Sequence, residues 1–176
     1  MLALVSAEPA GRIRSLDCSF VKVHRDGANP AGGQASQAMG MTKGGLNSKI
    51  VAVVDGVGRA VALALVAGPV GDVQAAASVR PELLGKIVIA DKGFDASALR
   101  EDLVRSQAIT CIPPRRNRKI VYRFSKPLYR HRHTVENFFC RIKIYRRAAT
   151  RYDKLAAHAL AFVTIAAILD WLNHEV

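Results

Sequence analysis

The order in which strand-like and helix-like patterns follow one another constrains the fold of this chain more than any other feature. Apolar or alternating runs rich in Val and Ile predict strands, and longer amphipathic runs predict helices. Five strands are expected: 15–23, two runs within 46–68 that flank a hairpin turn at 55–58, 85–91 and 108–114. Helices are expected at 71–84, 95–107, 126–147 and 155–172.

Three strands followed by strands linked through helices predict one mixed sheet with helices on its faces. The run at 85–91 is almost wholly apolar, which indicates that both sheet faces are covered there. The fold class is therefore α/β, and the ribonuclease-H-like fold is a candidate because it has the same order. We expect residues 1–176 to form a single domain, with the Gly-, Ala- and Ser-rich segment 24–45 as a mobile loop.

The positive charge is concentrated in one segment. The chain has 26 Lys and Arg residues against 14 Asp and Glu residues, a net charge of +12. Residues 113–154 contain 14 of the basic residues but only two acidic ones, Glu136 and Asp153. A disordered basic arm is the alternative, but the aromatic and aliphatic residues after "PPRRNRKIVYR" favour a folded surface. A concentrated basic patch predicts binding to a polyanion, here a nucleic acid.

The sequence also bears on the compartment. The three cysteines form no CxxC pair, which fits thiols in a reducing cytoplasm. The N-terminus lacks the charged region and long apolar core of a signal peptide. His158, Thr164 and Asp170 interrupt the apolar run at 155–172, which favours a buried core helix over a membrane span.

Two aspartates stand where a charge needs a partner. Asp17 lies inside the first predicted strand, and Asp91 ends the apolar run "KIVIAD". An unpaired buried carboxylate is costly, and ligands usually bind at strand ends in α/β sheets. Asp91 could instead be a turn or cap residue, although Asp95 fits the cap of the following helix better. Asp17 could instead face water from an edge strand.

A third acid, Glu136, is embedded in the most basic stretch, "YRHRHTVENFFCRIK". At 100° per residue, Tyr129, Arg132, Glu136 and Lys143 share an arc of about 60° on a helix. The apolar residues of the stretch occupy the adjacent arc and would face the core. Ordinary i,i+4 pairing explains Arg132 with Glu136, but it leaves Tyr129 and Lys143 without a role.

The spacing of these four residues, Y-(2)-R-(3)-E-(6)-K, matches the signature of bacterial insertion-sequence transposases. The chain looks like the families numbered four and five, and most like family five. "SLDCSFVKVHR" resembles the first-aspartate motif of that family, and "ADKGFD" resembles the second. "KGGLNSKIVAVVDGVG", "CIPPRRNRK" and "RRAATRYDKLA" are also similar to family sequences, so the resemblance covers nearly the whole chain from Asp17 onward.

The resemblance implies a DDE transposase catalytic domain with the ribonuclease-H-like fold of the retroviral-integrase superfamily. Asp17, Asp91 and Glu136 would be the catalytic residues and would bind two Mg²⁺ or Mn²⁺ ions, since hard cations take oxygen ligands. Two such metals can activate the attacking oxygen and stabilise the leaving one. The reaction would be strand cleavage at the element's ends, followed by strand transfer into target DNA. Asp26 and Asp55 rank well below Asp17 as the first ligand.

The resemblance also implies how DNA is held. Tyr129, Arg132 and Lys143 would contact the DNA backbone beside the metals. The basic loop would add phosphate contacts from Arg115, Arg116 and Arg118. The expected partner is double-stranded DNA, both transposon ends and target, bound by a homo-oligomer in the bacterial cytoplasm at the nucleoid, with no membrane involved.

One departure from the family pattern concerns the N-terminus. Family members usually carry a helical DNA-binding region before the first aspartate, whereas 16 residues precede Asp17 here. The chain would then be the second half of an element expressed in two reading frames, or a truncated copy. Two other functions stay open: a non-catalytic DNA-binding relic or regulator, and a metal-dependent nuclease of the same fold.

Overall fold

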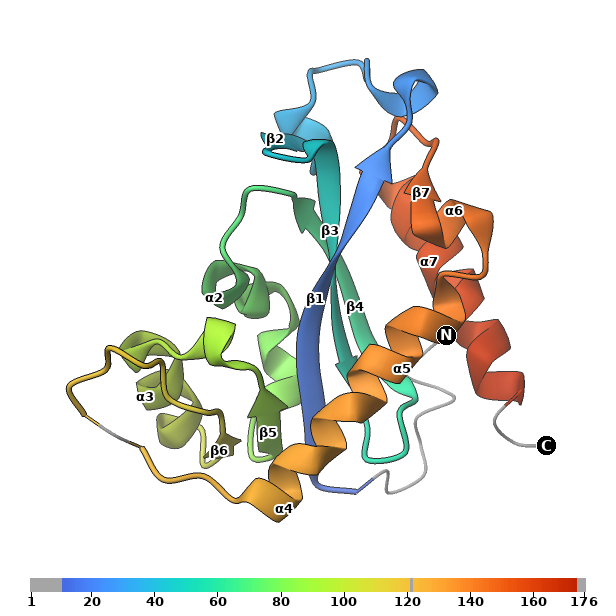
Figure 1. Cartoon of the computed structure of the whole chain (residues 1–176). Helices are drawn as coiled ribbons and strands as arrows, with labels where there is room; N and C mark the ends of the chain where they lie inside the picture. Colours follow the sequence, from blue (N-terminus) through green and yellow to red (C-terminus); the bar gives the residue numbers. More distant parts are fainter. Residues whose placement is uncertain (1–10, 121, 174–176) are drawn as a thin grey trace.

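The computed structural model describes residues 11–120 and 122–173, arranged around one mixed sheet (Figure 1). Residues 1–10, which carry most of the argument against a signal peptide, lie outside the described residues. The strand order is β2-β3-β1-β5-β6, with β4 paired to β3 and β7 paired to β1. The strands are β1 Ile13–Val23, β2 Gly40–Thr42, β3 Gly45–Val54, β4 Ala60–Ala67, β5 Ile87–Ala90, β6 Ile109–Cys111 and β7 Thr150–Arg151.

The predicted five-stranded sheet is correct for the longer strands and wrong in number. β1, β3, β4, β5 and β6 correspond to the five predicted strands, whereas β2 and β7 bring the described sheet to seven. β2 has three residues and β7 has two, which is too short for an alternating pattern to show.

β1 is the central strand. One edge pairs antiparallel with β3 over 15–22, and the other edge pairs parallel with β5 over 13–16. At its far end, this second edge pairs parallel with β7 at Lys22 and Val23. β5 pairs parallel with β6, and β3 pairs antiparallel with β4. The sheet is therefore antiparallel on one side of β1 and parallel on the other.

Helices cover both faces of the sheet. They are α2 Asp72–Ala75, α3 Ser97–Arg105, α4 Lys126–Tyr129, α5 His133–Ile142, α6 Arg146–Ala149 and α7 Ala156–Asn173, with short 3-10 turns η1 Arg25–Gly27, η2 Ala35–Gln37, η3 Ala76–Leu83, η4 Lys92–Phe94 and η5 Arg130–Arg132. Successive β3 side chains feed two separate cores, because strand side chains alternate between faces. Val51 and Val53 pack with η3 and Leu103 of α3, whereas Ile50 and Ala52 pack with α5 and α7.

The segment 24–45, predicted as a mobile loop, contains η1, η2 and β2. Its backbone is tied to the sheet and to the C-terminal part of the chain. The carbonyl of Gln37 accepts a 2.7 Å bond from the buried guanidinium of Arg151, and the carbonyl of Ala38 accepts one from the Ser48 hydroxyl. The segment therefore has local structure, and its mobility stays a prediction.

α7 is, among the described residues, the one helix long and apolar enough to cross a membrane, with a mean hydropathy of 1.5. One side of it packs on the sheet through Val163 and Ala167. Asp170, near its end, is buried and paired with Arg141 of α5 at 2.6 Å. Packing on a sheet and a buried ion pair are typical of a core helix, as predicted for this run.

Candidate active site

The parallel pairing of β1 with β5 brings the first two candidate aspartates together. Leu16 pairs with Ala90, so Asp17 and Asp91, the next residue on each chain segment, lie side by side where β5 ends. Asp91 also has the turn role considered from the sequence, because its Oδ1 accepts a 2.7 Å hydrogen bond from the Gly93 amide at the start of η4. Asp91 can therefore cap η4 and lie beside Asp17 at the same time.

The segment α4–η5–α5 brings the third acid to the same place by crossing over β1 (Figure 1). A polar seam anchors it: the Ser15 hydroxyl donates to the carbonyl of His131, and the Thr134 hydroxyl lies 3.3 Å from Ser15 Oγ. Arg132 forms an ion pair with Glu136, and its Nη2 lies 4.0 Å from Asp17 Oδ2. The i,i+4 pair that was the alternative explanation for these two residues exists, and it lies next to the first aspartate.

Five side chains form one electrostatic cluster. Burial raises the pKa of Asp17, and the nearby charges of Asp91 and Glu136 raise it further, against the opposing effects of a backbone amide and Arg132. Burial also raises the pKa of Tyr129, with the same three acids adding to the effect. Burial alone would lower the pKa of Arg132, but Glu136 and Asp17 raise it above its usual range. Tyr129 therefore stays a neutral hydroxyl and Arg132 a cation beside the acids.

Lys143, the fourth signature residue, lies farther along β1. Its Nζ donates to Ser19 Oγ at 2.5 Å and to the carbonyl of Phe20 at 3.3 Å. Burial lowers the pKa of its ammonium. The predicted stripe is therefore split: Tyr129, Arg132 and Glu136 lie with the aspartates, whereas Lys143 lies over the β1 edge beyond them. No pattern in the sequence indicated that Ser19 would be its partner.

A buried aspartate fixes the basic loop that follows β6. The side chain of Asp95 is fully buried and accepts hydrogen bonds from Arg100 Nε at 2.8 Å and from the Arg115 amide at 2.7 Å. Arg118 Nη1 lies 3.0 Å from the same carboxylate. The prediction that Asp95 caps α3 is wrong, because the cap residue is Ala96 and has no side-chain bond. Asp95 instead pairs with arginines that lie before and after β6.

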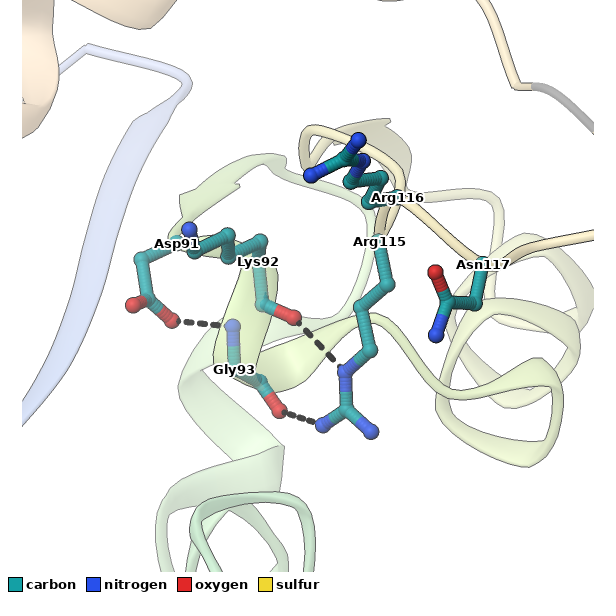
Figure 2. A pocket seen from close by; sticks show the side chains of 6 residues that line it. All are labelled: Asp91, Lys92, Gly93, Arg115, Arg116 and Asn117. Carbon is teal, nitrogen blue, oxygen red and sulfur yellow. Dashed lines mark hydrogen bonds between the residues drawn. The ribbon is translucent and has the colours of Figure 1, made fainter.

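The docked loop forms an open pocket of about 790 Å³ beside Asp91 (Figure 2). Its lining residues are Asp91, Lys92, Gly93, Arg115, Arg116 and Asn117. Arg115 extends along the surface toward η4, where its guanidinium donates to the carbonyls of Lys92 and Gly93 at 3.0 and 2.7 Å (Figure 2). Arg116 is exposed, and its guanidinium has no recorded partner among the described residues. Of the three loop arginines predicted to contact DNA, Arg116 is thus the one whose guanidinium makes no hydrogen bond or ion pair within the described residues.

The three acids are chemically suited to bind a divalent ion, but Glu136 must move before all three can bind the same ion. Carboxylate oxygens are preferred ligands of hard cations, and the acids are close enough to perturb one another. Yet no three His, Cys, Asp or Glu side chains in the described parts of the chain are placed to hold one ion together. Arg132 pairs with Glu136, whose side chain is 49% exposed, so a shared ion requires Glu136 to leave Arg132.

Comparison with known proteins identifies the family. The family described as "Transposase DDE domain" matches residues 8–171. The predicted transposase for insertion sequence element IS6501 of Brucella ovis is 34% identical over 130 residues, which is 73% of this chain and 100% of that protein. No solved structure matches the chain. The resemblance to insertion-sequence transposases is therefore confirmed. The chain belongs to the DDE transposase family, whose members are metal-dependent polynucleotidyl transferases that act on DNA.

Proposed function

We propose that this chain cleaves DNA at the ends of an insertion sequence and transfers the cut strand to target DNA, using Asp17, Asp91 and Glu136 as its catalytic carboxylates. The observation that carries the proposal is the convergence of these acids from three elements. Asp17 comes from the centre of β1, Asp91 follows β5, and Glu136 lies on the helix that crosses β1. Residues so far apart in sequence have no shared folding reason to place their negative charges together.

The ribonuclease-H-like fold is part of this proposal. In support, the order β4-β3-β1-β5-β6 combines an antiparallel meander with two parallel strands joined through helices. In this arrangement the edge of β1 is open just beyond the end of β5. A substrate can reach Asp17 and Asp91 there without displacing a strand.

The carboxylates would hold two Mg²⁺ or Mn²⁺ ions. When bound, these ions supply activation of the attacking oxygen and stabilisation of the leaving oxygen. The protein's part is to hold the three acids at one place. Burial raises the pKa of Asp17, and the charges of Asp91 and Glu136 add a smaller effect in the same direction. Before metal arrives, Arg132 partly neutralises Asp17 and Glu136.

DNA would be held by the signature residues and by the basic loop. Tyr129, kept neutral by burial, can donate a hydrogen bond to a phosphate oxygen. Arg132, once released from Glu136, can take a phosphate instead, as guanidinium groups pair readily with phosphates. Lys143 would act farther along the strand, and Arg116 would meet the backbone at the pocket beside Asp91.

The working complex would be a homo-oligomer on transposon ends and target at the nucleoid, in keeping with insertion-sequence family five. Recognition of terminal repeats by an N-terminal half from another reading frame stays a prediction. The alternative is a non-catalytic DNA-binding relic, and the Arg132–Glu136 ion pair is the observation in its favour. Strand transfer decides between them: a pre-cut, labelled transposon end should join to plasmid in Mn²⁺ with the wild type, and should not join with Asp91→Asn. Equal joining would exclude this active site.

A further inference from the structure

The open edge of β1 continues well beyond the carboxylates. β5 covers this edge at 13–16 and β7 covers it at 22–23, and in the described residues no strand pairs with it in between. Figure 1 shows β5 beside the beginning of β1 and β7 beside its tip. Asp17 is thus at one end of an uncovered edge and Lys22 is at the other. They are five positions apart along the strand, a separation of about 16 Å.

A groove lies at the Lys22 end. It consists of two adjoining hollows of about 700 and 470 Å³ that share Lys22, Gly44 and Thr150. The first extends to Phe20 and Lys43, and the second extends to His24 and Arg25 in the turn after β1. No acidic residue lines either hollow.

Two of the three Lys and Arg cations of this groove have no acidic partner in the described chain. Lys22 and Lys43 are exposed, and within the described chain neither ammonium has a recorded partner. The side chain of Arg25 is 90% exposed and has only Asp26, at 3.6 Å. Phe20, 54% exposed, adds an apolar surface beside Lys22 on the face of β1 that is turned toward α2. Cations beside an exposed aromatic ring are typical of nucleic-acid grooves.

Counting charges along the sequence could not reveal this groove. Outside 113–154 the acidic and basic residues balance in number, which suggests a neutral surface there. In the folded chain, however, many of those acids are taken up by ion pairs away from the groove. The pairs are Asp55 with Arg59, Asp95 with Arg100, Glu101 with Arg105, and Asp102 with Arg80. Asp72 is also paired, with Lys49, whose ammonium lies 5.0 Å from the centre of the Phe20 ring. Lys22 and Lys43 are left as net positive charge.

We propose that this groove binds the phosphate backbone of the duplex DNA whose strand is cut at the carboxylates. This inference rests on the proposed function, because Asp17 marks the cut. At about 3.4 Å per nucleotide along a strand, the 16 Å separation places the contact about five nucleotides from the scissile bond. The DNA would pass along the open edge of β1, where Lys143 bonds to Ser19 Oγ and to the Phe20 carbonyl between the two places. The groove fixes the direction in which DNA leaves the active site.

The first test measures duplex binding as a function of salt. The affinity falls as salt rises, and each lost phosphate contact makes the slope of log K against log salt less steep by about 0.9. Lys22→Ala with Lys43→Ala should therefore make it less steep by about 1.8. The matched control is Arg12→Ala with Lys86→Ala, which removes the same charge at the opposite end of β1, where Arg12 and Ile87 are hydrogen-bonded. The control slope should equal that of the wild type. Equal slopes for both double variants would overturn the groove.

The second test fixes the register. Cys140 is the exposed native thiol, so Lys22→Cys is made in a Cys140→Ser background and joined by a disulfide to one modified phosphate of a duplex. Added Mn²⁺ should then nick that duplex about five nucleotides from the tether. Tethering through Lys86→Cys should give no such fixed position. Nicks scattered along DNA tethered at position 22 would overturn the proposal.

The two tests separate this inference from the function on which it rests. A reduced salt slope with no nicking of any tethered DNA would support the groove and contradict the catalytic triad. Nicking by the wild type, together with an unchanged salt slope in the Lys22 and Lys43 variant, would support the catalytic triad and contradict the groove. Thermal melts exclude misfolding as a cause, because both lysines are exposed and unpaired in the described chain, so their removal should leave the midpoint nearly unchanged.

Discussion

Arg132 and Glu136 form an ion pair one helical turn apart, and the same guanidinium lies 4.0 Å from Asp17. A cation of the protein therefore already lies beside two of the acids that are proposed to bind metal. The Nε of Arg132 is buried and has no hydrogen-bond partner among the described residues, so this N–H can still donate a hydrogen bond. In the proposed mechanism, metal binding and the release of Arg132 toward DNA would therefore be linked.

Divalent metal should stabilise the protein through the three acids. At a concentration one hundred times Kd, Mn²⁺ should add about 2.7 kcal/mol, or roughly 5–10 °C in thermal midpoint for a chain of this size. Asp91→Asn should lose the gain, because it removes a ligand charge but keeps an acceptor for the Gly93 amide. Arg132→Gln should respond at lower Mn²⁺, since the competing cation is gone. A midpoint that ignores Mn²⁺ would contradict the triad.

Asp17 should make the metal-free protein less stable as pH rises. Its pKa is raised above 3.8 in the native state, so the native state binds more protons than the unfolded state in the window that begins near 3.8 and extends upward through the raised value. Relative to Asp17→Asn, the wild type should lose stability across this window and then reach a plateau. Urea midpoints measured from pH 3 to pH 8 without metal would show it. Parallel curves for the two proteins would contradict a raised pKa.

Asp95 should be a principal anchor of the basic loop. Asp95→Ala leaves Arg100 and Arg118 without their buried partner and should cost about 3–5 kcal/mol in the free energy of unfolding. Asp95→Asn should cost less, because an amide oxygen can still accept from the Arg115 amide. Asp102→Ala breaks a partly exposed pair with Arg80 and serves as the control with little expected change. Urea denaturation measures all three.

Arg116 and Arg118 should separate DNA binding from stability. Arg116→Ala should lower the salt slope of duplex binding by about 0.9 while the thermal midpoint stays the same. Arg118→Ala should lower the midpoint, because it loses Asp95 and a 2.8 Å bond to the Ser97 hydroxyl. Anisotropy titrations and melts on the same preparations decide the matter. A slope unchanged by Arg116→Ala would place the DNA away from this pocket.

The sequence predicted the longer strands and singled out the three acids because both leave local signals, whereas the grouping of the acids followed from the family resemblance. Asp91 follows an unbroken apolar run, and Glu136 is the single acid in its basic stretch, so each stood out as a charge in an unfavourable place. The parallel pairing of Leu16 with Ala90, which makes Asp17 and Asp91 neighbours, is a long-range contact that no local pattern records.

The partners of the arginines could not be predicted for the same reason. Arg115 and Arg118 read as solvent-facing cations, yet their partners are Gly93, about 20 positions earlier, and the buried Asp95. The helical wheel assumed one continuous helix through Lys143, whereas η5 tightens the chain at Arg130–Arg132 and α5 ends at Ile142. These tertiary contacts decide which cations remain available to DNA.

The most direct measurement of the central claim is plasmid nicking by the wild type and by Glu136→Gln. Glu136→Gln keeps the shape of the side chain and removes the ligand charge, so folding and DNA binding should persist. Asn137→Ala, at the exposed next position of α5, is the control. The account predicts slow, Mn²⁺-favoured nicking with little sequence preference by the wild type and the control, and none by Glu136→Gln. Nicking by Glu136→Gln at the wild-type rate would contradict it.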